Sequence, residues 1–133
     1  RAADWMGAGR VVIHSGALMK RSRQAALDIA METLPKVIAA CDREGFSHIT
    51  LCPETMGKIN QLGDLEEVLT LCTEAEGLLP CVDFGHLYAR SLGALDGPEA
   101  VERMLDQMVR ELGVARASQC LYAPGGRGPA LNL

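Results

Sequence analysis

Aromatic residues, paired cysteines and long apolar runs are all scarce in this sequence. Aromatic side chains make up 4% of its 133 residues, and its five cysteines include no Cys-x-x-Cys pair. We therefore expect buried, reduced thiols rather than a disulfide framework or a zinc knuckle. No apolar stretch approaches the ~18 residues that cross a bilayer, and no basic-then-apolar signal peptide is present. These absences favour a cytoplasmic protein that does not bind membranes.

The length and the hydrophobic content of the chain suit a single globular domain. Hydrophobic residues make up 48% of the chain, which is ordinary for a protein with a packed core. The net charge of −4 argues against a protein that coats nucleic acid non-specifically, although a local basic patch can still meet phosphates. The chain starts at Arg1 rather than at a methionine, and we expect it to begin inside a larger fold.

Short apolar runs alternate with amphipathic segments along the first 113 residues. The pattern predicts strands at 11–14, 47–53 and 78–82, and helices at 19–43, 64–77 and 97–112. Gly45 is expected to cap the first helix, Asp64 with Glu67 to form a capping box, and Pro35 to bend the first helix. Nearly continuous apolar strands joined by helices indicate parallel strands and an α/β fold.

The remaining residues, 114–133, lose this alternation and are expected to form a divergent or disordered tail. The glycines at 125, 126 and 128 lack the preceding strand, the following helix and the Gly-Lys-Ser/Thr ending of a phosphate-binding loop. We therefore assign no phosphate site to them.

Metal-ligating residue types follow each predicted strand. His14 follows the first strand, Glu54 the second, and Asp83 with His86 the third. The carboxyl ends of parallel strands share one edge of a sheet, where α/β proteins place their chemistry. Imidazole nitrogen and carboxylate oxygen together suit zinc, manganese or iron better than magnesium or calcium. The sequence therefore predicts a divalent-metal site at this edge.

Each of these residues also has a simpler interpretation. An Asp at the end of a strand often caps a loop, and a lone His often bonds a neighbouring carbonyl. His48 lies at the start of its predicted strand, away from Glu54, and is expected to be structural or exposed.

Three segments resemble the endonuclease IV family, also called deoxyribonuclease IV, within the xylose-isomerase-like TIM barrels. They are Val11-Val12-Ile13-His14-Ser15-Gly16, Pro53-Glu54-Thr55-Met56-Gly57-Lys58-Ile59-Asn60-Gln61-Leu62-Gly63 and Cys81-Val82-Asp83-Phe84-Gly85-His86. The resemblance covers residues 1–113 and implies a (β/α)8 barrel, here a partial barrel of about three β/α units. It implies hydrolysis of DNA on the 5′ side of abasic sites.

The resemblance also assigns residue roles. The family holds up to three metal ions, usually zinc, and manganese is an alternative. His14 would bind the first ion, Glu54 would bridge the first and second, Asp83 would bind the second, and His86 the third. The polar loop after Glu54 offers Lys58, Asn60 and Gln61 for contacts with DNA. Ligands from further strands are missing, so an incomplete barrel is expected to self-associate.

Two other functions remain open. A sugar isomerase or epimerase of the same superfold also holds a divalent metal through carboxylate and His, but it needs a Lys base or an aromatic wall. The low aromatic content offers little material for such a wall. The third possibility is a non-catalytic barrel fragment, which the metal content of the protein would distinguish from both enzymes.

Overall fold

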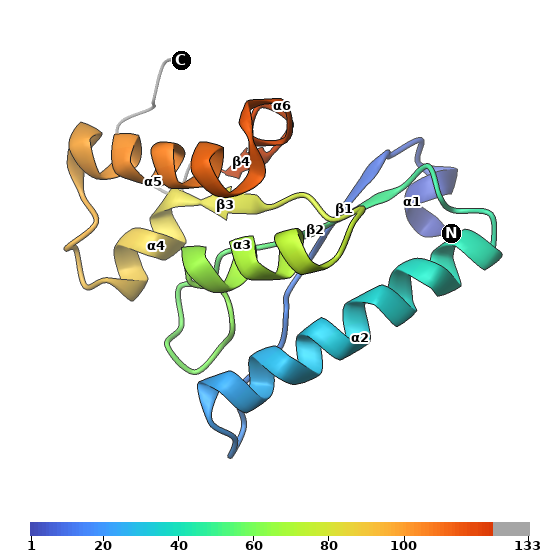
Figure 1. Cartoon of the computed structure of the whole chain (residues 1–133), viewed down its shortest axis with the longest axis horizontal. Coiled ribbons are helices and arrows are strands. Elements are labelled where there is room, and N and C mark those ends of the chain that lie inside the picture. Colours follow the sequence, from blue (N-terminus) through green and yellow to red (C-terminus); the bar gives the residue numbers. More distant parts are fainter. Residues whose placement is uncertain (124–133) are drawn as a thin grey trace.

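The computed structural model describes residues 1–123, which form ten elements (Figure 1). In chain order they are α1 (Ala2–Trp5), β1 (Arg10–Ile13), α2 (Arg23–Arg43), β2 (Thr50–Pro53), α3 (Leu65–Glu74), β3 (Cys81–Asp83), α4 (Phe84–Arg90), α5 (Gly97–Leu112), α6 (Val114–Ala117) and β4 (Leu121–Ala123).

The four strands run parallel in the order of the sequence. β1 pairs with β2 and β3 pairs with β4, each as a parallel ladder. Isolated parallel bridges from Leu51 to Leu78 and from Glu54 to Cys81 join the two pairs. The prediction of adjacent parallel strands in an α/β fold is confirmed, although residues 47–49 and 78–80 lie outside the strands.

The end of the described chain corrects the predicted tail. Residues 114–123 contain α6 and the fourth parallel strand, β4, instead of a disordered segment. The strand has only three residues, which are too few to show a strand pattern in the sequence. Its parallel pairing with β3 stabilises it in the structure. The glycines at 125, 126 and 128 lie outside the described residues.

Helices α2, α3 and α5 pack beside one another on one side of the strands (Figure 1). The predicted capping box is present: the Asp64 carboxylate accepts from Glu67 N, and the Glu67 carboxylate accepts from Asp64 N. Gly45, at φ +86°, follows the end of α2 as predicted. The long helix continues through Pro35 without interruption, and a bend there stays a prediction.

A single core lies between these helices and the strands. Its members are apolar residues of the helices together with the strand side chains that face them, among them Val68, Leu69, Val82 and Met108. All five cysteines are free thiols, as predicted, and four of them are buried. Burial raises the pKa of Cys72 to about 12, so this thiol stays protonated and unreactive. Within residues 1–123, no helix is both long and apolar enough to cross a membrane.

Candidate metal centre

The alternation of side chains along the strands brings the predicted ligands to one face. Val82 and its register partner Tyr122 lie on the helix side, because Val82 belongs to the core and the Tyr122 hydroxyl donates to Ala117 O in α6. Asp83 therefore projects from the opposite face. The same two-residue period puts His14 and Glu54 on that face, since Ile13 and Leu51 pack on the helix side.

Glu54 occupies the middle of the site, and its two oxygens face different neighbours. Oε2 lies 3.2 Å from His14 Nε2, whereas Oε1 lies 3.7 Å from His86 Nδ1. The carboxylate is 14% exposed, and the His14 side chain is 62% exposed at the outer edge. Each oxygen of a carboxylate can bind a separate ion. The two oxygens of Glu54 therefore face different neighbours, and its role as a bridging ligand stays a prediction.

Asp83 ends β3 and also caps the helix that follows. Its Oδ1 accepts a hydrogen bond of 2.8 Å from His86 N, while its Oδ2 faces the His86 ring with 3.7 Å to Nδ1. The helix α4 was not predicted from the sequence, because its seven residues are too few for a clear apolar period. The capping role of Asp83 is real, yet it occupies one oxygen and leaves the other for a ligand.

His86 is oriented by a backbone carbonyl. Its Nδ1 lies 2.8 Å from Thr55 O. A carbonyl can only accept, so Nδ1 carries the proton and Nε2 keeps the lone pair that binds metals. Gly57 lies against the ring, with an added Cβ 3.5 Å from His86 Cδ2. A carbonyl partner of this kind typically fixes the tautomer of a metal-binding histidine.

Thr55 links the two strands that carry Glu54 and Asp83. Its buried hydroxyl accepts from Asp83 N at 2.8 Å and donates to Asp83 O at 3.2 Å. Its own amide donates to Cys81 O at 3.0 Å. The side chain thus completes the pairing between the ends of β2 and β3 and fixes the spacing of their carboxylates.

We expect Thr55→Val to weaken both the fold and the site. The valine fits the space but removes the hydroxyl that accepts from Asp83 N, and a buried donor without a partner costs about 1–3 kcal/mol of unfolding free energy. Metal affinity should fall about 10–100-fold, as for other residues that orient ligands. Chemical denaturation and metal titration measure the two effects.

Two matched variants serve as controls for this experiment. Thr55→Ser keeps the hydroxyl and should retain metal affinity, whereas Thr73→Val removes the exposed hydroxyl that donates to Thr70 O and should change little. Unchanged metal affinity in Thr55→Val would contradict the positioning role.

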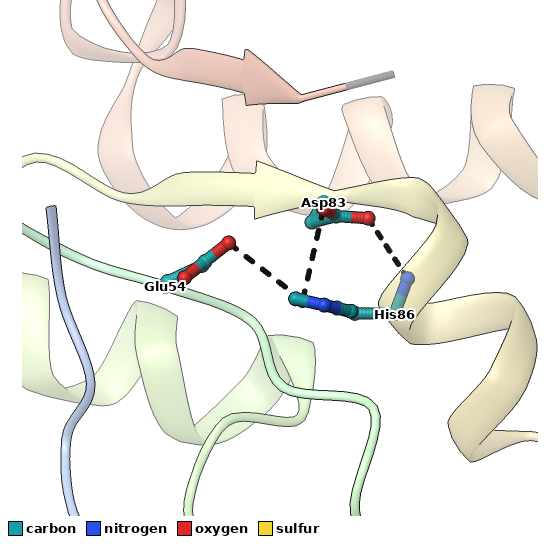
Figure 2. A group of neighbouring side chains, drawn as sticks. All are labelled: Glu54, Asp83 and His86. Atoms are coloured by element: carbon teal, nitrogen blue, oxygen red, sulfur yellow. Dashed lines mark hydrogen bonds and ion pairs between the residues drawn. The ribbon is translucent and has the colours of Figure 1, made fainter. Parts of the chain in front are cut away.

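The donor set fits a divalent cation. Glu54, Asp83 and His86 each offer a ligand atom, and these three atoms lie within 4.8 Å of one another (Figure 2). His14 adds a second imidazole beside Glu54. Two carboxylates and two imidazoles are a donor set for zinc, manganese or iron. The structure brings Glu54, Asp83 and His86 together and places His14 beside Glu54, and metal binding by these four residues stays a prediction.

The loop after Glu54, residues 55–63, forms the neighbouring rim of the site and is called the rim loop below. Lys58 and Asn60 are exposed on it, and Gln61 is half-buried. Gly63 closes the loop at φ +134°, where a Cβ would lie 2.7 Å from Met56 Cγ and 2.9 Å from Glu54 O. The rim loop therefore requires glycine at this position.

Comparison with known proteins agrees with this architecture. Residues 1–127 match the family described as xylose isomerase-like TIM barrel. The chain belongs to this family. An uncharacterised protein of Methanocaldococcus jannaschii is similar, with 33% identity over 103 residues. That alignment covers 77% of this chain and 37% of the relative, so the chain spans little more than a third of the relative that it matches.

Membership confirms the predicted α/β fold and is consistent with a partial barrel. The family is largely enzymatic, includes sugar isomerases and endonucleases, and often binds divalent metals. The endonuclease IV branch and the choice of metal stay predictions. The match also extends past residue 113, in agreement with the observed β4.

Proposed function

We propose that this protein is a metal-dependent phosphodiester hydrolase of the endonuclease IV type, which cuts DNA on the 5′ side of abasic sites in base excision repair. The observation that carries this proposal is the orientation of Glu54, with one oxygen toward His14 and the other toward His86 and Asp83. A carboxylate that bridges ions is typical of sites that hold two or more metal ions. Paired ions suit phosphoryl displacement because they stabilise both the attacking and the leaving oxygen.

The four residues would divide the ions among them. His14 and Glu54 would hold the first ion, Glu54 and Asp83 the second, and His86 would hold a third through Nε2. The hydrogen bond from His86 Nδ1 to Thr55 O supports this division because it leaves Nε2 free. Divalent ions, in this proposal zinc or manganese, supply Lewis-acid activation of the phosphate and of the attacking water when they are bound.

The rim loop provides the proposed contacts with the DNA backbone. Lys58 contributes a positive charge, and the side-chain amides of Asn60 and Gln61 can bond phosphate oxygens. Because the net charge of the chain is −4, the chain as a whole does not attract DNA, and the attraction must come from the positive charge of Lys58 itself. Salt should therefore raise the KM for DNA, since each cationic contact releases counterions from the duplex.

A sugar isomerase receives less support from the surroundings of the site. Among the described residues, the aromatic pair beside β3 is Phe84 and Tyr122, whose rings stack with centroids 6.1 Å apart. Phe84 packs against the core on the helix side, and Tyr122 lies on that side because its hydroxyl donates to Ala117 O. They do not form an aromatic wall around the ligands.

Incision of a duplex with one tetrahydrofuran abasic analogue tests the proposal. This analogue cannot undergo β-elimination, so cleavage reports hydrolysis. We expect the full-length natural protein to cut on the 5′ side and leave a 3′-hydroxyl. Chelation should abolish cleavage, and added zinc or manganese should restore it.

An intact duplex of the same sequence is the matched control and should remain uncut. Metal-loaded protein that leaves the abasic duplex intact would contradict the proposal. Interconversion of an aldose and a ketose by that same preparation would favour the isomerase.

A further inference from the structure

Two arginines from different helices hold the rim loop through its backbone. Arg23 lies in the first turn of α2, and Arg90 is the last residue of α4. The two residues are 67 positions apart in the sequence, yet both guanidinium groups bind carbonyl oxygens of the rim loop. Neither arginine lies among the proposed metal ligands.

Arg23 binds the outer part of the loop. Its Nη2 donates to Ile59 O and to Gln61 O, each at 2.9 Å. Its Nε lies 3.3 Å from Glu67 Oε1. A guanidinium presents donors in a fixed plane, so a single side chain can hold two carbonyls and a carboxylate together.

Arg90 binds the same loop from the side of α4. Its Nη1 donates to Lys58 O at 2.9 Å, to Gln61 O at 3.2 Å and to Met56 O at 3.3 Å. The side chain is 11% exposed. Gln61 O accepts hydrogen bonds from both Arg23 and Arg90, so the two arginines share this acceptor.

Glu67 supplies the negative charge that this arrangement needs. The carboxylate is 7% exposed and lies 3.3 Å from Arg23 and 3.9 Å from Arg90. Its Oε2 also accepts from Gly63 N at 2.8 Å, where the rim loop ends. Glu67 therefore faces both arginines and binds the loop itself, and Asp64, at 3.9 Å from Arg90, adds a second negative charge.

We infer that Arg23 and Arg90 are positioning residues, which hold the rim loop preformed so that Lys58 and Asn60 meet the phosphate backbone of the substrate. The inference rests on the proposed function for the identity of the substrate. The hydrogen bonds occupy the carbonyl groups of the loop and leave the Lys58 and Asn60 side chains exposed. Preformed contacts lower the ordering cost of binding.

Charge-preserving variants test this inference. Arg23→Lys and Arg90→Lys keep the positive charge and the ion pair with Glu67, but a lysine cannot hold several carbonyls in one plane. Hydrogen exchange of peptides covering 56–63 reports the order of the loop. Steady-state incision of the abasic duplex by the full-length natural protein separates KM from kcat.

In each variant we expect amide exchange across 56–63 to rise at least about tenfold. The KM for the abasic duplex should rise about tenfold, while kcat and metal content stay near wild type. A side chain that only stabilised the fold would leave KM unchanged in the folded fraction. Unchanged loop exchange or unchanged KM in both variants would overturn the inference.

Two controls separate charge from loop order. Arg21→Lys alters an exposed arginine of the preceding loop and should change neither readout. Lys58→Gln should raise KM without altering exchange, because the backbone bonds of the rim loop remain. If the wild type does not incise abasic DNA, the proposed function fails, and exchange alone decides whether the arginines order the loop.

Discussion

Replacing Glu54 with Gln should abolish incision almost completely, with a loss of about two to three orders of magnitude in kcat/KM. Gln keeps the shape of the side chain and removes its charge. The amide nitrogen cannot ligate, so a side chain that faces His14 on one side and His86 on the other would no longer join the two proposed ions. Metal analysis and the incision assay should show both losses together.

Glu76→Gln is the matched control for this experiment, since Glu76 is exposed after α3. It undergoes the same chemical change and should keep full activity and full metal content. Wild-type metal stoichiometry and incision in Glu54→Gln would show that the carboxylate does not bridge ions.

The 133-residue chain expressed alone should self-associate or unfold with weak cooperativity. Within residues 1–123, β1 and β4 each pair on one side only, so both edges of the sheet present unpaired backbone groups. Val12 is 46% exposed on the face that carries the ligands. We expect sedimentation velocity to show oligomers that grow with concentration, and metal binding weaker than in a full-length relative.

Val12→Lys tests the role of this face in association. A charge on an open edge strand opposes pairing with another chain, and we expect the association constant to fall about tenfold, equal to 1.4 kcal/mol. Lys20→Arg, in an exposed loop, is the control. A stable monomer with a sharp unfolding transition and three tightly bound ions would contradict this account.

The sequence predicted the parts of the fold that local chemistry determines. Asp64 and Glu67 formed the expected capping box, and Gly45 followed the end of α2. The short elements were missed, because α4 and β4 contain too few residues to show a period. Their positions depend on long-range partners, such as β3 for β4, and a single sequence does not reveal these.

The sequence also predicted which side chains meet, because parallel strands bring their carboxyl ends to one edge. His14, Glu54, Asp83 and His86 were found from their places after apolar runs. The simpler roles also occur: Asp83 caps α4, and His86 bonds a carbonyl. The capping role of Asp83 uses Oδ1 and leaves Oδ2, and the carbonyl bond of His86 uses Nδ1 and leaves Nε2. The sequence alone does not show which atom of each side chain is used.

The supporting residues could not be predicted in the same way. Thr55 is buried next to Glu54, and its neighbour Asp83 is 28 positions away. Arg23 and Arg90 bind backbone carbonyls. Every residue has such a carbonyl, so the residue types of the loop do not indicate that an arginine binds there. The charges of Glu67 and its two arginines are spread over three helices.

Anomalous diffraction from crystals of the zinc-loaded protein is the most direct test of the metal site. The account predicts a peak with oxygens of both Glu54 and Asp83 within about 2.0–2.2 Å, and a neighbouring peak shared by Glu54 and His14. His86 should bind an ion through Nε2 while Nδ1 remains on Thr55 O. Zinc bound elsewhere, with these four side chains uncoordinated in catalytically active protein, would contradict the account.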